Sequence, residues 1–222
     1  MCGRFVRKGE PKKVAQNLGV VAGEENWTTS YNVAPGSTIP IIRADPAGRH
    51  MVPATWGFTS SGRAPLFNAR GETIDSLPNF RDAFRMNRCL VPASGFYEWR
   101  PSDRQPFYFE MVNGHPLTFA GIWKQVGNQL QATVITTNPN ADMQGIHHRM
   151  PVILSPDVWI DWLSTTPLPD NLCRSLLSPS PDGTLSRWPV GRGVGSIRND
   201  YPGLIERVEP QPTTQGLFPM SS

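Results

Sequence analysis

The sequence has few cysteines and no long apolar run. Its three cysteines, Cys2, Cys89 and Cys173, are odd in number and far apart, which suits neither a disulfide framework nor the paired ligands of a zinc site. No apolar stretch is long enough to cross a bilayer, and no signal-peptide core follows Met1. We therefore expect a soluble globular protein of the cytoplasm, without a membrane partner.

We also expect little regular helix, because residues that break helices are abundant. The 222 residues include 20 glycines and 23 prolines, which argues against long helical bundles and coiled coils. Hydrophobic residues make up 38% of the chain, enough to bury a core at this length. The net charge of +3 permits nucleic-acid binding without demanding it.

Short apolar runs bounded by Pro and Gly predict a protein rich in strands. These runs lie at residues 38–42, 51–58, 89–99, 106–112, 117–123, 130–137 and 151–154. Helical patterns fall irregularly between them, at residues 11–18, 76–85, 155–163 and 169–177. This order lacks the regular alternation of a doubly wound sheet, so we expect an α+β domain with a curved, mainly antiparallel sheet. The domain should span residues 2–209, and residues 210–222, rich in Pro, Thr, Gln and Ser, should form a flexible tail.

Common cofactor motifs are missing. Gly191, Gly193 and Gly195 alternate, but no strand-turn-helix unit surrounds them, so a turn is expected rather than a dinucleotide site. His147 and His148 are adjacent, which in a strand points them to opposite faces, and no second ligand pair lies nearby. We expect no metal and no organic cofactor.

Cys2 carries the most informative chemistry. Removal of Met1, which is usual before a small second residue, would leave a cysteine with a free α-amine, a 1,2-aminothiol. Such a group forms a Schiff base with an aldehyde, and attack by its thiolate on the same carbon closes a thiazolidine. It could equally attack an acyl carbon, as in a thiol hydrolase or amidotransferase. A frayed N-terminus with an incidental thiol is the third interpretation.

Glu98 and His147 are candidates for proton transfer. Glu98 lies in the aromatic run Gly95–Trp99, where desolvation would raise its pKa and let a protonated carboxyl act as general acid. The alternative is a surface carboxylate paired with Arg100 or with another cation. His147 lies in a polar stretch before an apolar strand and could shuttle protons, although spacing alone does not choose between it and His148.

Several other side chains suit a polar or nucleic-acid ligand. Asn68 and Arg70 share one face if the chain is extended, where an amide could orient a small polar group. Arg4 and Arg70 suit phosphate recognition, although loop arginines are most often merely solvated. Trp99 could stack on a base or fill the core, and Pro35 could form a turn or wedge against a base.

Six short motifs follow one another along the chain. They are Met1–Phe5, Tyr31–Gly36, Trp56–Phe58, Asn68–Arg70 with Glu72 and Thr73, Phe96–Trp99, and Ile146–Pro151. In this order they resemble the SOS response-associated peptidase (SRAP) family, whose members crosslink to abasic sites in single-stranded DNA. The resemblance runs from residue 2 to about Glu206. It implies a single SRAP domain, with a curved mainly antiparallel sheet or open barrel and flanking helices.

The resemblance also implies a function. Cys2, exposed at the mature N-terminus, would form a thiazolidine with the ring-opened sugar aldehyde of an abasic site and so protect the lesion during the DNA damage response. Asn68 would position the α-amine or the sugar, Glu98 would act as acid and base near the amine, and His147 would assist ring opening and slow reversal. The protein, expected to be a monomer, would associate with the nucleoid when bound to DNA.

The resemblance assigns DNA contacts as well. By analogy with the family, Arg4, Asn32 and Arg70 would contact DNA phosphates. Pro35 and Trp99 would contact bases near the lesion, and Thr136 would complete the pocket. Two positions depart from the family pattern. Pro78 stands where some relatives carry a basic residue, and His148 stands where many carry Asp, which leaves the pH dependence open.

Two other functions fit the residues. In a thiol hydrolase, either a protease or an N-terminal-nucleophile amidase, Cys2 would attack an acyl carbon with His147 as base. The family name reflects removal of residues ahead of the cysteine, and here only Met1 precedes it. In a non-covalent single-strand-binding module, Cys2 would be incidental and the arginines and aromatics would bind DNA.

Overall fold

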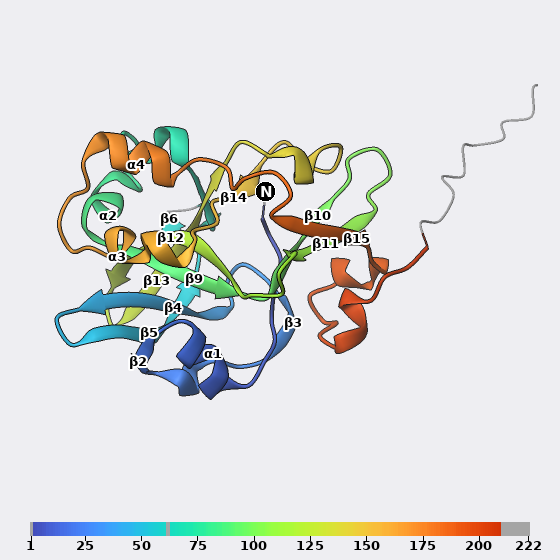
Figure 1. The fold of residues 1–222 in the computed structure, drawn as a ribbon, viewed down its shortest axis with the longest axis horizontal. Coiled ribbons are helices and arrows are strands. Elements are labelled where there is room, and N and C mark those ends of the chain that lie inside the picture. Colours follow the sequence, from blue (N-terminus) through green and yellow to red (C-terminus); the bar gives the residue numbers. More distant parts are fainter. Residues whose placement is uncertain (1, 61–62, 210–222) are drawn as a thin grey trace, which may run out of the picture.

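The computed structural model describes residues 2–60 and 63–209, and the tail expected at residues 210–222 lies outside the described residues. Strands dominate and the helices are few and short, which confirms the α+β class (Figure 1). Within the described part of the chain the strands form an eight-stranded sheet, a five-stranded sheet and a two-stranded ribbon.

The eight-stranded sheet closes on itself. Its main path consists of β2 (Val20–Ala22), β4 (Thr38–Asp45), β5 (Gly48–Trp56), β9 (Arg88–Ala93), β12 (Leu117–Val126), β13 (Gln129–Thr137) and β14 (Met150–Pro151). The order is β14-β13-β12-β9-β4-β5-β2, and β13 also pairs with β5 in parallel, so that β13, β12, β9, β4 and β5 form a ring. The other pairings in the ring are antiparallel. The expected curvature is therefore present, and it proceeds to a closed five-stranded barrel, which leaves these strands without free edges.

Strand β8 (Asn68–Arg70) lies outside the ring and pairs in parallel with β13. The five-stranded sheet packs beside the barrel and is antiparallel throughout. It consists of β1 (Phe5–Arg7), β3 (Ser30–Val33), β10 (Gly95–Trp99), β11 (Pro106–Met111) and β15 (Leu185–Pro189), in the order β15-β11-β10-β1-β3. The ribbon pairs β6 (Phe58–Ser60) with β7 (Arg63–Leu66).

The helices lie where helical patterns were expected, but they are shorter. They are α1 (Pro11–Asn17), α2 (Arg81–Met86), α3 (Trp159–Trp162) and α4 (Asp170–Leu176), and 3-10 turns cover residues 24–26, 71–73, 141–143, 156–158, 192–195 and 202–205. The Glu10 carboxylate accepts the first free N–H groups of α1, and Pro11 fits its first turn. No helix of the described residues is long and apolar enough to cross a membrane.

One expected strand, residues 89–99, is two strands in different sheets. At Ser94 the backbone N–H donates to the Val6 carbonyl, and the hydroxyl bonds to the backbone of Lys8. These bonds turn the chain out of the barrel. As a result β9 stays in the barrel, whereas β10 carries Glu98 into the second sheet beside β1.

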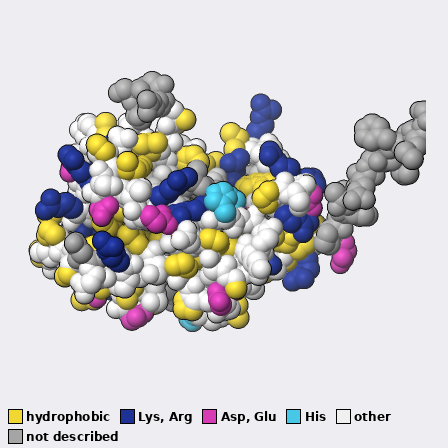
Figure 2. All heavy atoms as spheres, turned by 90° about the horizontal axis from the view of Figure 1, so that it is seen from above, with side chains coloured by type: hydrophobic (Ala, Val, Ile, Leu, Met, Phe, Trp, Pro, Cys, Tyr) yellow, Lys and Arg dark blue, Asp and Glu magenta, His cyan; other side chains and the backbone are white. Residues whose placement is uncertain are grey.

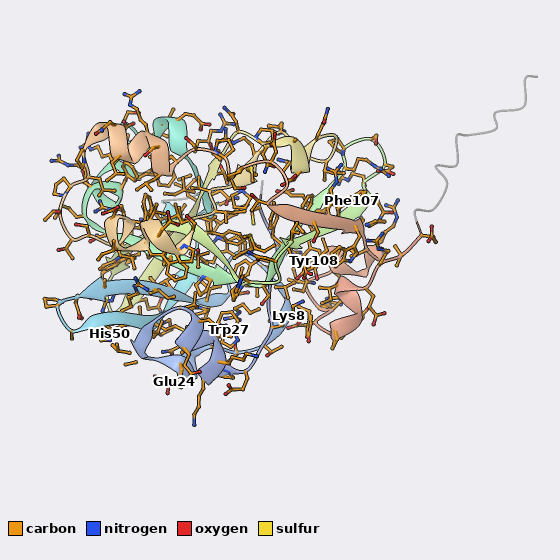
Figure 3. All side chains as sticks on the ribbon, in the orientation of Figure 1. Lys8, Glu24, Trp27, His50, Phe107 and Tyr108 are labelled. Atoms are coloured by element: carbon orange, nitrogen blue, oxygen red, sulfur yellow. The ribbon has the colours of Figure 1, made fainter. Side chains whose placement is uncertain are left out.

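An aromatic layer joins the two sheets. The Phe96 ring of β10 stacks on the Phe109 ring of β11, with ring centroids 4.9 Å apart. It also packs edge-to-face with Phe119 of the barrel strand β12, with centroids 5.9 Å apart. On β11, Phe107 belongs to this central core, while Tyr108 packs in a separate cluster on the opposite face, near Lys8 (Figure 3). This packing fixes β10, the strand on which Glu98 lies.

Gly95, at the start of β10, has no room for a side chain. A Cβ there would lie 2.3 Å from the Tyr108 hydroxyl and 2.5 Å from the Phe109 carbonyl oxygen. We predict that Gly95→Ala lowers the free energy of unfolding by about 2 kcal/mol, because the β10–β11 pairing must shift. Denaturant unfolding measures this loss. Gly191→Ala is the matched control, since Gly191 has open space and a φ of −60°, and an equal loss in both variants would contradict the packing argument.

Candidate functional site

Four segments bring Cys2, Asn68, Glu98 and His147 to one region. Cys2 precedes β1, Asn68 begins β8, Glu98 lies in β10, and His147 lies in the loop before β14. The Asn68 Nδ2 donates to the Cys2 carbonyl at 2.9 Å. The His147 Nε2 lies 4.0 Å from the Glu98 Oε2. Residues widely separated in sequence thus surround the start of the chain.

Cys2 is buried, which differs from the expected exposed cysteine. Its exposed fraction is 0%, and it belongs to the core that includes Phe5 and Trp56. Burial, reinforced by the nearby Glu98 charge, raises the pKa of the Cys2 thiol far above its usual range. The thiol is therefore protonated at neutral pH. In the full chain the Cys2 nitrogen is a peptide nitrogen, and it becomes an amine only when Met1 is removed.

Glu98 is desolvated. Its exposed fraction is 3%, and burial raises the pKa of its carboxyl to about 7. The alternative of a surface pair with Arg100 is wrong, because Arg100 donates instead to both carboxylate oxygens of Asp103. Near neutral pH the Glu98 carboxyl can therefore both donate and accept a proton.

His147, rather than His148, faces Glu98. Both histidines lie in a loop and not in a strand, so their rings stack at 4.5 Å instead of pointing to opposite faces. Burial lowers the pKa of His147 to about 4, so its imidazole is neutral at pH 7. Its Nδ1 lies 3.0 Å from the backbone nitrogen of Arg149 and 3.1 Å from the carbonyl oxygen of that residue. His148 is exposed.

Strand β8 presents Asn68 and Arg70 on one side, as its alternation predicts. Ala69 between them is buried, while Arg70 is exposed. The Asn68 Oδ1 is buried and has no hydrogen-bond partner among the described residues. It can therefore accept a hydrogen bond from a ligand or from an amine at Cys2.

Asn32 acts within the protein. Its Oδ1 accepts from the Arg4 Nε at 3.1 Å. Its exposed fraction is 6%, and its amide nitrogen donates to the carbonyls of Val194, Ser196 and Asn199. Asn32 therefore holds Arg4 against this segment, and its polar atoms are already in use.

The remaining expected DNA contacts differ in exposure. Pro35 is partly exposed beside Gly36, whose φ of 88° forms the turn. Trp99 is partly exposed at the end of β10. Thr136 is fully buried, and its hydroxyl donates to the Ala69 carbonyl at 3.3 Å, which holds β8 against β13. The structure thus leaves Pro35 and Trp99 accessible, whereas Thr136 lies behind β8.

Glu72 and Arg149 form an ion pair that the sequence motifs did not reveal. The Arg149 Nη1 and Nη2 donate to the two Glu72 carboxylate oxygens at 2.7 and 2.8 Å. The two residues stand 77 positions apart, so their spacing carried no signal. Each belongs to a motif that also holds a candidate site residue, Asn68 or His147, but nothing in the motifs indicated that the two residues pair.

Basic side chains, with acidic ones among them, lie on the face where the chain begins. The mark N stands in the upper middle of Figure 1, beside the labels β14 and β10. The same face, viewed in Figure 2, shows an exposed histidine with Lys and Arg side chains on both sides. Among residues 2–60 and 63–209, no group of three His, Cys, Asp or Glu side chains could hold a metal ion.

The family model described as SOS response associated peptidase (SRAP) matches residues 1–197. This chain belongs to the SRAP family. The abasic site processing protein YoqW of Bacillus subtilis is 32% identical to this SRAP protein, with 93% of this chain and 99% of the relative covered. The abasic site processing protein HMCES of Gallus gallus is 30% identical, with 84% and 68% covered. A Bacteroides thetaiotaomicron crystal structure shares the fold, with a TM-score of 0.81, 23% identity, and 94% and 100% of the two chains covered.

Burial of Glu98 should make the stability of this SRAP protein depend on pH. The folded-state pKa of about 7 lies above the ordinary glutamate value of 4.5, so the folded state binds the proton more tightly than the unfolded state. The stability that the protonated Glu98 carboxyl contributes is complete below pH 4.5 and is lost as the pH rises through 7. We predict that Glu98→Gln is more stable than the wild type at pH 8, by up to about 3 kcal/mol, and gains little at pH 4.

Denaturant unfolding at the two pH values measures this difference. Glu110→Gln is the matched control, because the Glu110 side chain is 26% exposed and its carboxylate pairs with Lys8 near the surface. An effect of Glu98→Gln that is the same at pH 4 and pH 8 would contradict the raised pKa.

Proposed function

We propose that this protein captures abasic sites in single-stranded DNA through a reversible covalent bond to Cys2, formed after Met1 is removed, and so protects the lesion during the response to DNA damage. The observation that carries the proposal is the meeting of Cys2 with Asn68, Glu98 and His147 in one region. Membership of the SRAP family and relatives named abasic site processing proteins support the choice of substrate.

The ring-opened sugar of an abasic site offers an aldehyde to the aminothiol. The free Cys2 amine adds to the aldehyde carbon, and loss of one water gives a Schiff base. The Cys2 sulfur then bonds to the same carbon while its proton passes to a base, and the five-membered thiazolidine closes. The overall reaction releases one water and requires no oxidant or reductant.

The surrounding groups suit the proton transfers of this reaction. Protonated Glu98 can give a proton to the departing hydroxyl, and the resulting carboxylate can take the thiol proton. That second step is needed because burial raises the pKa of the Cys2 thiol. Asn68 can orient the amine through its Oδ1. Neutral His147, 4.0 Å from Glu98, can assist ring opening and the slow reversal.

The DNA strand would be held mainly by charge. Exposed Arg70 and partly exposed Arg4 are available to phosphates, with Asn32 acting through Arg4. Trp99 and Pro35 are accessible for contact with bases, and Thr136 would support β8 from behind. Because phosphate contacts release counterions, non-covalent binding should weaken as salt is raised.

A thiol hydrolase fits the site less well. Such an enzyme works with a cysteine of lowered pKa beside a protonated histidine. Here burial raises the pKa of the Cys2 thiol and lowers that of His147 to about 4. An aldehyde, which the Cys2 amine attacks first, is therefore the better electrophile for this site.

Variants of Cys2 separate covalent capture from binding. We predict that Cys2→Ala abolishes a heat-stable adduct with an abasic-site oligonucleotide but retains most of the non-covalent affinity. Cys2→Ser keeps the amine and should give an adduct only after borohydride reduction of the Schiff base, because its hydroxyl does not close the thiazolidine. Cys173→Ser, at a partly exposed cysteine elsewhere, should behave as the wild type.

Denaturing gel electrophoresis reports these adducts. A heat-stable adduct of Cys2→Ser without reduction would exclude the thiazolidine linkage. Loss of both capture and affinity in Cys2→Ala would show that Cys2 is structural.

The rate of capture should pass through a maximum with pH. It rises with pH while the Cys2 amine loses its proton, and it falls above about 7 as Glu98 loses the proton that it must donate. We predict that Glu98→Gln slows capture at saturating DNA by about 100-fold and removes the alkaline fall. Quenched single-turnover reactions from pH 5 to pH 9 give both results, and an unchanged rate and profile would remove Glu98 from the mechanism.

A further inference from the structure

Glu72 and Arg149 connect the two segments that carry Asn68 and His147. Glu72 follows β8 in the 3-10 turn at residues 71–73, and Arg149 lies two residues after His147. The Arg149 side chain is 9% exposed, and each of its terminal nitrogens donates to a different Glu72 oxygen, at 2.7 and 2.8 Å. This bidentate ion pair restricts the orientation of the guanidinium more than a single hydrogen bond would.

The same guanidinium also holds the end of β13. The Arg149 Nη2 donates to the Thr136 carbonyl at 2.7 Å, and the Nη1 donates to the Asn138 Oδ1 at 3.2 Å. Thr136 is the β13 partner of Arg70 in β8. One side chain therefore links the end of β8, the end of β13 and the loop before β14.

The backbone of Arg149 passes this restraint to His147. Its nitrogen and carbonyl oxygen lie 3.0 and 3.1 Å from the His147 Nδ1, and the opposite ring nitrogen lies 4.0 Å from Glu98. A displacement of the Arg149 backbone would therefore turn or shift the imidazole relative to the Glu98 carboxyl.

We propose that Glu72 and Arg149 are positioning residues for abasic-site capture, and that their ion pair holds the His147 imidazole against the Glu98 carboxyl. The inference rests on the proposed function. The Arg149 side chain is 9% exposed, and its terminal nitrogens already donate to Glu72, Thr136 and Asn138. In this respect it differs from exposed Arg70.

Two variants loosen the pair while keeping its size. Glu72→Gln removes the charge of the carboxylate, and Arg149→Lys keeps the positive charge but loses the bidentate hydrogen bonding. Glu110→Gln is the matched control, since it makes the same chemical change in the Lys8–Glu110 pair. We expect both pair variants to slow single-turnover capture at saturating DNA by about tenfold, because small displacements of reacting groups are costly. The control should keep the wild-type rate.

The decisive comparison combines Glu72→Gln with His147→Ala. If the pair acts through His147, Glu72→Gln should slow capture about tenfold in the wild type but leave the rate of His147→Ala unchanged. Non-covalent affinity, measured in a Cys2→Ala background, should stay within about twofold throughout. An equal slowing in both backgrounds, or no slowing in either, would overturn the proposal.

A second measurement needs no DNA and separates this inference from the proposed function. The ring resonances of His147 report its titration by NMR. The charged and titratable groups that face the imidazole are the N-terminal amine, Glu98 of β10, and Arg149 and His148 of its own loop. We expect Glu72→Gln and Arg149→Lys to move the pKa of His147 up from about 4 toward its ordinary value, because the imidazole gains access to water.

The outcomes of the two measurements are distinct. If the wild-type protein forms no adduct, the proposed function fails, and the titration still tests the positioning role. An unchanged His147 titration in a folded variant contradicts positioning, even where capture occurs. If Glu72→Gln does not fold, Arg149→Lys, which keeps the buried charge, provides the same comparison.

Discussion

Burial places the Glu98 carboxyl and the His147 imidazole side by side, 4.0 Å apart, in a part of the protein that disfavours charge. In water the carboxyl would lose its proton well before the imidazole does. Here burial raises the pKa of Glu98 to about 7 and lowers that of His147 to about 4. Both groups can therefore be neutral just below pH 7, where the Glu98 carboxyl can either give or take a proton. The chemistry assigned to Cys2 depends on this arrangement, because its own thiol is protonated.

The fold supplies this burial through the join between its two sheets. The turn at Ser94 takes the chain from the barrel into the second sheet, and stacking of Phe96 between the sheets keeps β10 in place. Closure of the barrel puts β13 where β8 can pair with it, so Asn68 reaches the backbone of Cys2. The ion pair of Glu72 and Arg149 ties β8 to the His147 loop.

Local patterns predicted the parts of this structure that depend on neighbours in sequence. The helical pattern beginning at Pro11 predicted the start of α1, and the aromatic run around Glu98 indicated a desolvated carboxyl as one of two interpretations. The break at Ser94 could not be predicted, because the apolar pattern continues across it and hydrogen bonds to β1 and Lys8 decide it. Burial of Cys2 depends on packing between residues far apart in sequence. The internal bonds of Asn32 and the Glu72–Arg149 pair likewise join distant segments, for which sequence spacing has no signal.

Capture of an aldehyde by the mature N-terminus is the central claim, and intact-protein mass spectrometry tests it most directly. The intact mass of the purified protein would be measured before and after incubation with a single-stranded oligonucleotide that contains one abasic site. The account predicts that Met1 is absent and that the mass rises by that of the oligonucleotide less one water. A protein that lacks Met1, binds the oligonucleotide and yet shows no such increase would contradict it.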